Sequence, residues 1–278
     1  MLAFNLEYYK PKTIEEAVEC FFLLKKENKR AIYYSGGTEI LTLGRLNLLQ
    51  MDAVIDIKSI SECLEFNFEH NQLIAGAALS LTYIEERNYF PLLSTVAKEV
   101  ADHTARNKIT LGGNVCGQIF YREAVLPFLL CDSNVVIAGE GGKETASIHQ
   151  IFNGAFQLEE GQFLIQLLTD QEYITMPFAS LKKRQQWETG YPLITVSSIK
   201  VDNRLRFAFS GLCSFPFRST EMEDALNQAN KSLHIRIQQA IDHIPAQVLD
   251  DIEGSREYRL FVLRNTLEEI ITELEGEG

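Results

Sequence analysis

The sequence predicts an α+β protein of two domains, and three observations support that prediction. The first hundred residues alternate short β-branched or aliphatic runs with runs of helical periodicity. Residues 192–219 then show two strands with alternating apolar positions, and the chain is helical from about Glu221 onward. Finally, 278 residues are enough for two domains of roughly 100–200 residues each.

The N-terminal part opens with a well-marked helix. In residues 10–28 (KPKTIEEAVECFFLLKKEN), Thr13 is placed to cap the helix, and Glu16 completes a capping box three residues later. The pattern then predicts a strand in 31–37 that ends in a glycine turn, a short helix or loop in 38–50, strands in 52–60 and 72–80, and helical structure in 80–102 interrupted at Pro91.

The second half predicts a hairpin in 134–148 with its turn at 139–142, a strand in 162–169, and two strands joined at Asp202-Asn203. The clearest helix is 255–275, and its expected apolar face contains Tyr258, Phe261, Val262, Asn265, Ile270 and Leu274. The sequence pattern changes near Pro177, after which strands with alternating apolar positions follow. We therefore expect one domain in 1–175, with subdomains of about 1–57 and 58–175, and a second in 176–278.

Composition excludes several classes of protein. The net charge is −12 and no Lys/Arg stripe occurs, which argues against nucleic-acid binding. No apolar run reaches the roughly 20 residues of a membrane span, and the N-terminus does not look like a signal peptide. The five cysteines are odd in number and contain no CxxC, so we expect free thiols in the cytoplasm and no metal site.

Two glycine pairs are the candidate site. Gly36-Gly37 follows Tyr33-Tyr34, and Gly112-Gly113 follows a run that looks like a strand. Without a Cβ, each pair lets the backbone approach a ligand, and successive N–H groups in such a turn form an anion nest that suits a pyrophosphate. Thr38 and Thr110 could add hydroxyl donors. The alternative is two ordinary turns, and neither a GxGxxG fingerprint nor a P-loop is present.

The segments around these glycines resemble a known family. The stretches YYSGGTEI (33–40) and ARNKITLGGNV (105–115) are similar to the two flavin-contact loops of the FAD-binding subunits of molybdenum hydroxylases. The segment LKKRQQWETGYPLITVSSIKV (181–201) and the closing helix also resemble that family. The resemblance covers nearly the whole chain and is greatest to the flavin subunit of bacterial xanthine dehydrogenases.

The resemblance implies a fold and a set of site residues. The fold is a two-subdomain FAD-binding region of the PCMH/vanillyl-alcohol-oxidase type followed by a C-terminal α+β domain. FAD would be bound non-covalently, and no side chain would be catalytic. Glu123 would hold the ribose, the backbone at Leu164 would contact the isoalloxazine ring, and Lys182 would lie near the ring. The loop residues implied are Ser35, Gly36, Gly37, Thr38, Glu39, Ile40, Thr110, Gly112, Gly113 and Asn114.

Some positions leave alternatives open. Phe120, Tyr121 and Arg122 depart from the family pattern, so Arg122 could meet a phosphate in place of Glu123 binding ribose. Glu123 could also be a helix-start carboxylate, Leu164 plain core and Lys182 a solvated cation. Tyr34, Tyr121 and Trp187 either cover a ring face or pack in the core. We expect no covalent flavin link at His103.

The function that the resemblance implies is electron transfer. Electrons would pass from a 2Fe-2S iron–sulfur small subunit to FAD and then to NAD⁺ or another acceptor, while a molybdopterin-binding large subunit hydroxylates the substrate, xanthine or a related purine. Three alternatives remain: a stand-alone flavin oxidoreductase of the same superfamily, a flavin-free scaffold subunit, and a nucleotide-binding module without a redox role.

Overall fold

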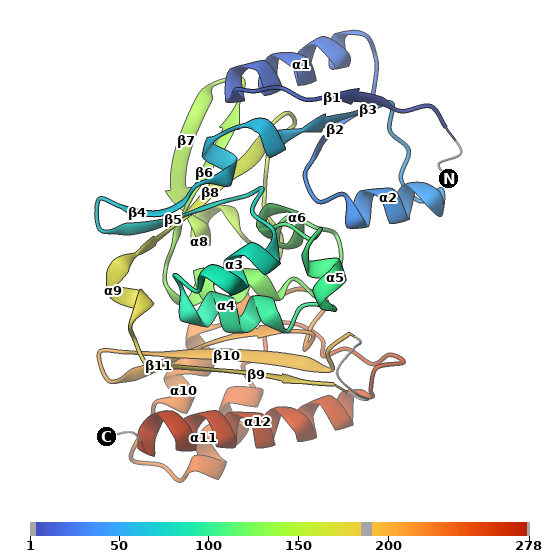
Figure 1. Cartoon of the computed structure of the whole chain (residues 1–278). Coiled ribbons are helices and arrows are strands. Elements are labelled where there is room, and N and C mark those ends of the chain that lie inside the picture. Colours follow the sequence, from blue (N-terminus) through green and yellow to red (C-terminus); the bar gives the residue numbers. More distant parts are fainter. Residues whose placement is uncertain (1–3, 185–190, 277–278) are drawn as a thin grey trace.

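A computed structural model describes residues 4–184 and 191–276 and arranges them around three β-sheets. Figure 1 shows the sheets following one another along the molecule, with the long C-terminal helix on the outer face of the third. The mixture of one parallel sheet, two antiparallel sheets and packed helices confirms the predicted α+β class.

The first sheet is parallel, because a helix or loop crossover separates its consecutive strands. Its order is β1-β3-β2. On β3, Ala53 and Ile55 pack in the same core as Ile14 of the first helix, while Val54 packs on the other face with Leu43 of the second. The predicted cap is confirmed, since Thr13 Oγ1 accepts from Glu16 N at 3.1 Å. The elements are β1 (Glu7–Tyr9), α1 (Ile14–Lys26), β2 (Ala31–Tyr34), α2 (Thr38–Arg45) and β3 (Ala53–Asp56).

The second sheet is antiparallel, in the order β4-β5-β8-β6-β7, and carries the largest apolar core. Its strands are β4 (Phe66–Glu69), β5 (Gln72–Gly76), β6 (Asn134–Gly139), β7 (Gly142–Ser147) and β8 (Phe163–Asp170). Its helices are η1 (Ile57–Ser59), η2 (Glu62–Leu64), α3 (Leu81–Arg87), α4 (Pro91–Lys98), α5 (His103–Arg106), α6 (Leu111–Val115), η3 (Glu123–Val125), α7 (Leu126–Leu130), α8 (Ile148–Ile151) and α9 (Gln171–Ile174).

The third sheet is antiparallel in the order β12-β11-β10-β9. The predicted hairpin turn is confirmed, with Asp202 and Asn203 at φ 48° and 61° between β10 and β11. The elements are β9 (Phe178–Lys183), β10 (Ile194–Val201), β11 (Arg204–Ser210), β12 (Phe217–Arg218), α10 (Thr220–Leu226), α11 (Leu233–Ile241) and α12 (Arg256–Gly276). The change of sheet between Asp170 and Phe178 supports the division near residue 175, which stays a prediction.

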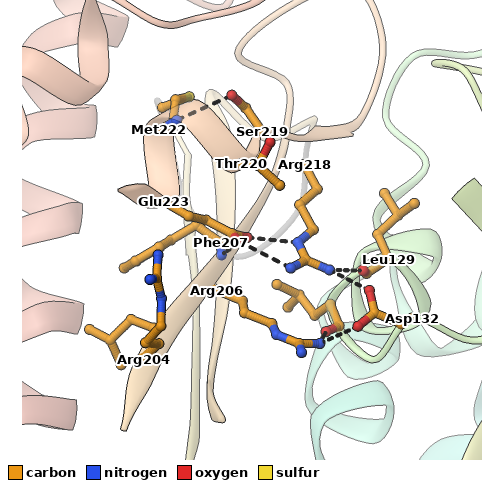
Figure 2. Close-up of polar contacts among 12 residues, drawn as sticks. Leu129, Asp132, Arg204, Arg206, Phe207, Arg218, Ser219, Thr220, Met222 and Glu223 are labelled. Atoms are coloured by element: carbon orange, nitrogen blue, oxygen red, sulfur yellow. Dashed lines mark hydrogen bonds and ion pairs between the residues drawn. The ribbon is translucent and has the colours of Figure 1, made fainter. Parts of the chain in front are cut away.

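Basic residues of the third sheet bind the ends of helices from the second unit, which consists of the second sheet and the helices named with it. Figure 2 shows Arg206 and Arg218 pointing at the end of α7, where they donate to Leu130 O at 2.8 Å and Leu129 O at 2.9 Å. Both guanidinium groups also pair with the Asp132 carboxylate, at 2.6 and 2.7 Å. Cations are favourable beside the carbonyl end of a helix, so these contacts fix the docking of the two units.

The same arrangement recurs at the end of α4. Lys182 Nζ and Arg184 Nη2, at the end of β9, donate to Glu99 O at 2.6 and 3.0 Å. Arg184 also pairs with the Glu99 carboxylate at 2.9 Å. The third sheet therefore meets the second unit at two helix C-termini, and one of them lies beside the candidate site.

Two element predictions need correction. The run before Gly112 is not a strand, because Thr110 caps α6 and Leu111 is already helical. On α12, Tyr258 and Phe261 are exposed, and the packed face contains Leu263, Leu267 and Ile270. In the part of the chain that the structure describes, no helix has the length and apolar character to cross a membrane.

Candidate cofactor site

Two adjoining cavities bring the predicted site residues together. Cavity 1, about 530 Å³, lies between the first sheet and β8, and cavity 2, about 700 Å³, lies between the second unit and the third sheet. Both are lined by Thr38, Glu39, Leu43, Gly113 and Gln118, so the cavities meet there. The other predicted residues line cavity 1 (Ser35, Gly36, Gly37, Ile40, Thr110, Gly112, Leu164) or cavity 2 (Asn114, Glu123, Lys182).

The first glycine loop leads into the N-terminus of α2. Gly37 takes the left-handed conformation at φ 73°, and no side chain caps the helix. The amides of Thr38, Glu39 and Ile40 therefore have no acceptor within the helix, and these residues line the cavities. Such a helix end is an anion-binding position, since unpaired N–H groups and the positive end of the helix dipole point the same way.

An ion pair that the sequence analysis missed supports this loop, with the Asp56 side chain 2% and the Lys58 side chain 39% exposed. Lys58 Nζ donates to Ser35 O at 2.7 Å and pairs with Asp56 at 2.8 Å. Burial alone would raise the pKa of the Asp56 carboxyl, but hydrogen bonds from Lys58 and Tyr8 hold that pKa below its ordinary value. The available signal was the sequence DIK (56–58), in which Asp56 is the last residue of the buried strand β3 and Lys58 follows two residues later.

The second glycine loop is not an open nest, which corrects that expectation. Gly112 N donates to Ala77 O at 2.8 Å, and Gly113 N donates to Thr110 Oγ1 at 3.3 Å. Thr110 Oγ1 also accepts from Gly36 N at 3.4 Å. Thr110 thus connects the two loops, and the amides of this loop are already used within the protein.

The glycines are needed for two different reasons. A Cβ at Gly36 would lie 2.1 Å from Lys108 O, and a Cβ at Gly112 would lie 2.7 Å from the Ala77 side chain. These two glycines allow the loops to pack on the protein. Gly113 is exposed and lines both cavities, and a Cβ there would meet only Thr110 Oγ1, at 2.8 Å. Gly113 is therefore the glycine of the second loop that leaves room for a ligand.

The structure shows where Glu123, Leu164 and Lys182, each predicted to have a separate role at the cofactor, lie relative to one another. Lys182 Nζ and Glu123 Oε1 are 2.7 Å apart, with side chains 4% and 3% exposed. These side chains, expected at the ring and at the ribose, therefore lie together in cavity 2. Leu164 and Lys182, both expected at the ring, line different cavities. Lys182 and Glu123 therefore lie side by side, Leu164 lines the adjoining cavity, and the three roles stay predictions.

The aromatic residues proposed to cover a ring face also lie in different places. The Tyr121 ring stacks on Tyr191 with centroids 4.7 Å apart, and both residues line cavity 2, whereas Tyr34 lines cavity 1. Arg122 is buried and donates to the carbonyl oxygens of Gly117 and Gly154, so it does not face either cavity as a phosphate ligand. His103 lines neither cavity. Trp187 lies outside the described residues.

Comparison with known proteins decides the family. The family described as "FAD binding domain in molybdopterin dehydrogenase" matches residues 3–168, more than half of the sequence. The chain belongs to this family. Membership confirms the relationship that the two glycine loops predicted, and with it the class of protein, a flavin-dependent oxidoreductase subunit.

Individual relatives are distant in sequence and close in fold. The chain is 22% identical to the xanthine dehydrogenase FAD-binding subunit of Escherichia coli O157:H7, over 96% of this chain and 94% of that one. It is 27% identical to the carbon monoxide dehydrogenase medium chain of Hydrogenophaga pseudoflava over 60% of this chain and 59% of that one. A carbon monoxide dehydrogenase structure from the same organism, lacking its Mo-pyranopterin moiety, gives a TM-score of 0.87 at 20% identity, covering 98% of both chains.

The residues present fit a dinucleotide cofactor. Ser35 Oγ, which lines cavity 1, is buried and has no hydrogen-bond partner within the described residues, so it can take a ligand contact. In cavity 2, Glu123 Oε1 already pairs with the Lys182 ammonium at 2.7 Å. Within residues 4–184 and 191–276, no three His, Cys, Asp or Glu side chains are grouped to hold a metal ion.

Proposed function

We propose that the chain is the FAD-carrying electron-transfer subunit of a molybdenum hydroxylase complex. The observation that carries this proposal is the uncapped N-terminus of α2 at the junction of two cavities, where both glycine loops meet. A diphosphate at that helix end would leave space on one side for each half of a dinucleotide. The proposed site is formed by the thirteen residues that the family resemblance implied, of which some would contact the cofactor and others shape the loops around it.

Cavity 2 suits the flavin ring better than cavity 1. It is the larger of the two, and the stacked Tyr121 and Tyr191 rings offer an aromatic wall. Lys182 lines it and would stabilise negative charge on a reduced ring. On this arrangement Leu164 contacts the adenosine half in cavity 1, and Glu123 orients Lys182 beside the ring.

The bound flavin would accept single electrons and deliver a pair, while the protein would bind and orient it. Relatives of the chain include a xanthine dehydrogenase FAD-binding subunit, a carbon monoxide dehydrogenase medium chain and a nicotinate dehydrogenase FAD-subunit. By analogy, we propose a molybdopterin-binding large subunit and a 2Fe-2S small subunit as partners. NAD⁺ as the final acceptor and xanthine or a related purine as the substrate are proposed on the same analogy. All five cysteines are free, which supports a cytoplasmic location.

The test is a visible absorption spectrum of the purified chain before and after incubation with FAD and desalting. We expect flavin bands near about 370 and 450 nm, and release of the dye by acid. A folded chain that stays colourless and binds ADP would contradict the redox role and favour a nucleotide-binding module. A chain that binds neither would favour a flavin-free scaffold. Turnover of a substrate by the flavin-loaded chain alone would favour a stand-alone oxidoreductase.

A further inference from the structure

Glu39 makes contacts that a ligand-binding role does not require. It is the second residue of α2, and its carboxylate oxygens lie 2.9 and 3.0 Å from Gln118 N. Oε1 also lies 2.8 Å from Ile119 N. Hydrogen bonds to an ionised carboxylate are roughly twice as strong as neutral ones. The carboxylate is therefore engaged by a chain segment 79 and 80 residues away in the sequence.

The segment it holds, residues 117–120, forms part of both cavity walls. Gln118 lines both cavities, Gly117 lines cavity 1 and Ile119 lines cavity 2. A Cβ at Gly117 would lie 3.1 Å from Glu39 Oε2, so a glycine is what allows this close approach. Arg122 Nη1 also donates to Gly117 O at 3.2 Å. The segment is thus held by the side chains of two residues.

The position of this segment also sets the aromatic wall of cavity 2. Phe120 is the last residue of the segment, and its ring centroid lies 4.2 Å from that of Tyr121. Tyr121 in turn stacks on Tyr191 at an interplanar angle of 15°. A displacement of Ile119 would therefore move the wall proposed to face the flavin ring.

We propose that Glu39 is a positioning residue that fastens the 117–120 segment to the first glycine loop, and that this contact slows release of the cofactor. The inference rests on the proposed function, since a dinucleotide spanning both cavities must pass the junction where Glu39 meets Gln118. A free carboxylate beside the α2 N-terminus would repel a diphosphate. Because the amides of Gln118 and Ile119 donate to it, the Glu39 carboxylate instead links the first glycine loop to the 117–120 segment.

The test compares Glu39→Gln with wild type in the full chain. The variant keeps the side-chain length and one carbonyl oxygen that can accept from both amides, but it removes the charge, and the NH₂ in place of Oε2 cannot accept from Gln118 N. We expect FAD release, measured by the rise in flavin fluorescence, to be about tenfold faster, the ratio expected when the hydrogen bonds from the two amides lose their charge assistance. Amide hydrogen exchange of Gln118 and Ile119 in the FAD-free protein should also accelerate. Glu15→Gln is the matched control, because Glu15 is the second residue of α1 and lies away from both cavities.

The outcomes separate the two proposals. Release at the wild-type rate would overturn the inference, and tighter binding would show instead that Glu39 only repels the diphosphate. Faster release with unchanged exchange of both amides would also overturn it, because Glu39 would then be a direct ligand. A wild-type chain that binds no FAD would defeat the proposed function itself, which the absorption spectrum detects independently of Glu39.

Discussion

The buried Lys182–Glu123 ion pair makes the stability of the protein sensitive to a substitution of either residue alone. Lys182→Met keeps the length of the side chain but leaves a carboxylate that is 3% exposed without its cation. Because removal of one partner strands a buried charge, we expect the free energy of unfolding in urea to fall by about 3–5 kcal/mol. The double variant Lys182→Met/Glu123→Gln should regain part of that loss, since no buried charge then remains.

A neighbour on the same strand provides the control for this prediction. Lys183 Nζ pairs with Glu269 at 2.8 Å, but its side chain is 35% exposed and that of Glu269 53%. Exposed pairs contribute about 0–1 kcal/mol, so Lys183→Met should change stability very little. Equal losses in the two single variants would show that the buried pair is no stronger than a surface pair.

At this scale the sequence identified positions better than roles. All thirteen predicted residues line the two cavities. What a pattern cannot show is which atoms face each other across the fold. The Gly112 amide is used by Ala77 O, and the Glu39 carboxylate is used by Gln118 N. These partners are far apart in the sequence, so only the folded chain reveals them.

At the scale of elements, the two glycine loops predict a different balance of stability loss and cofactor loss for two substitutions. A methyl group at Gly36 would approach Lys108 O, so Gly36→Ala should lower the free energy of unfolding by about 1–3 kcal/mol, as overpacking does, and weaken FAD binding with it. Gly113→Val adds atoms mainly toward the cavities, so it should abolish FAD binding with a smaller loss of stability. Thermal unfolding and bound-flavin absorbance of both variants check this pair. Equal stability losses would contradict the assigned roles.

Elements with strong local signals were predictable and those set by tertiary contact were not. Thr13 and the Asp202-Asn203 turn follow local chemistry, and both are confirmed. Helix α6 was missed because Ile109 and Leu111 look like part of a strand and two glycines disfavour a helix. Its Thr110 cap and the bond from Gly112 N to Ala77 O overcome that preference. Packing against the third sheet likewise decides which face of α12 is buried.

At the scale of the molecule, composition and pattern predict an α+β protein but not how its sheets meet. The docking of the third sheet depends on Arg206 and Arg218 reaching Asp132, which is more than 70 residues away in the sequence. No periodicity links these positions. Figure 2 shows both arginines converging on Asp132, so this cluster is where the cohesion of the two units can be tested.

Asp132→Asn should loosen that docking in a pH-dependent way. Burial alone would raise the pKa of the Asp132 carboxyl, but His149, Arg218 and Arg206 hold it well below its ordinary value. The folded pKa is thus lower than the unfolded value of about 3.9, so the stabilisation is complete above that pH and declines as the pH falls further.

Because the Asp132 side chain is 41% exposed, solvent screening limits the expected loss of stability to about 1–2 kcal/mol at neutral pH. Urea unfolding should show the difference from wild type shrinking below about pH 4. Asp202→Asn is the control, with the same φ of 48° and no ion pair within the described residues. A difference that persists unchanged in acid would mean that the Asp132 charge does not hold the third sheet in place.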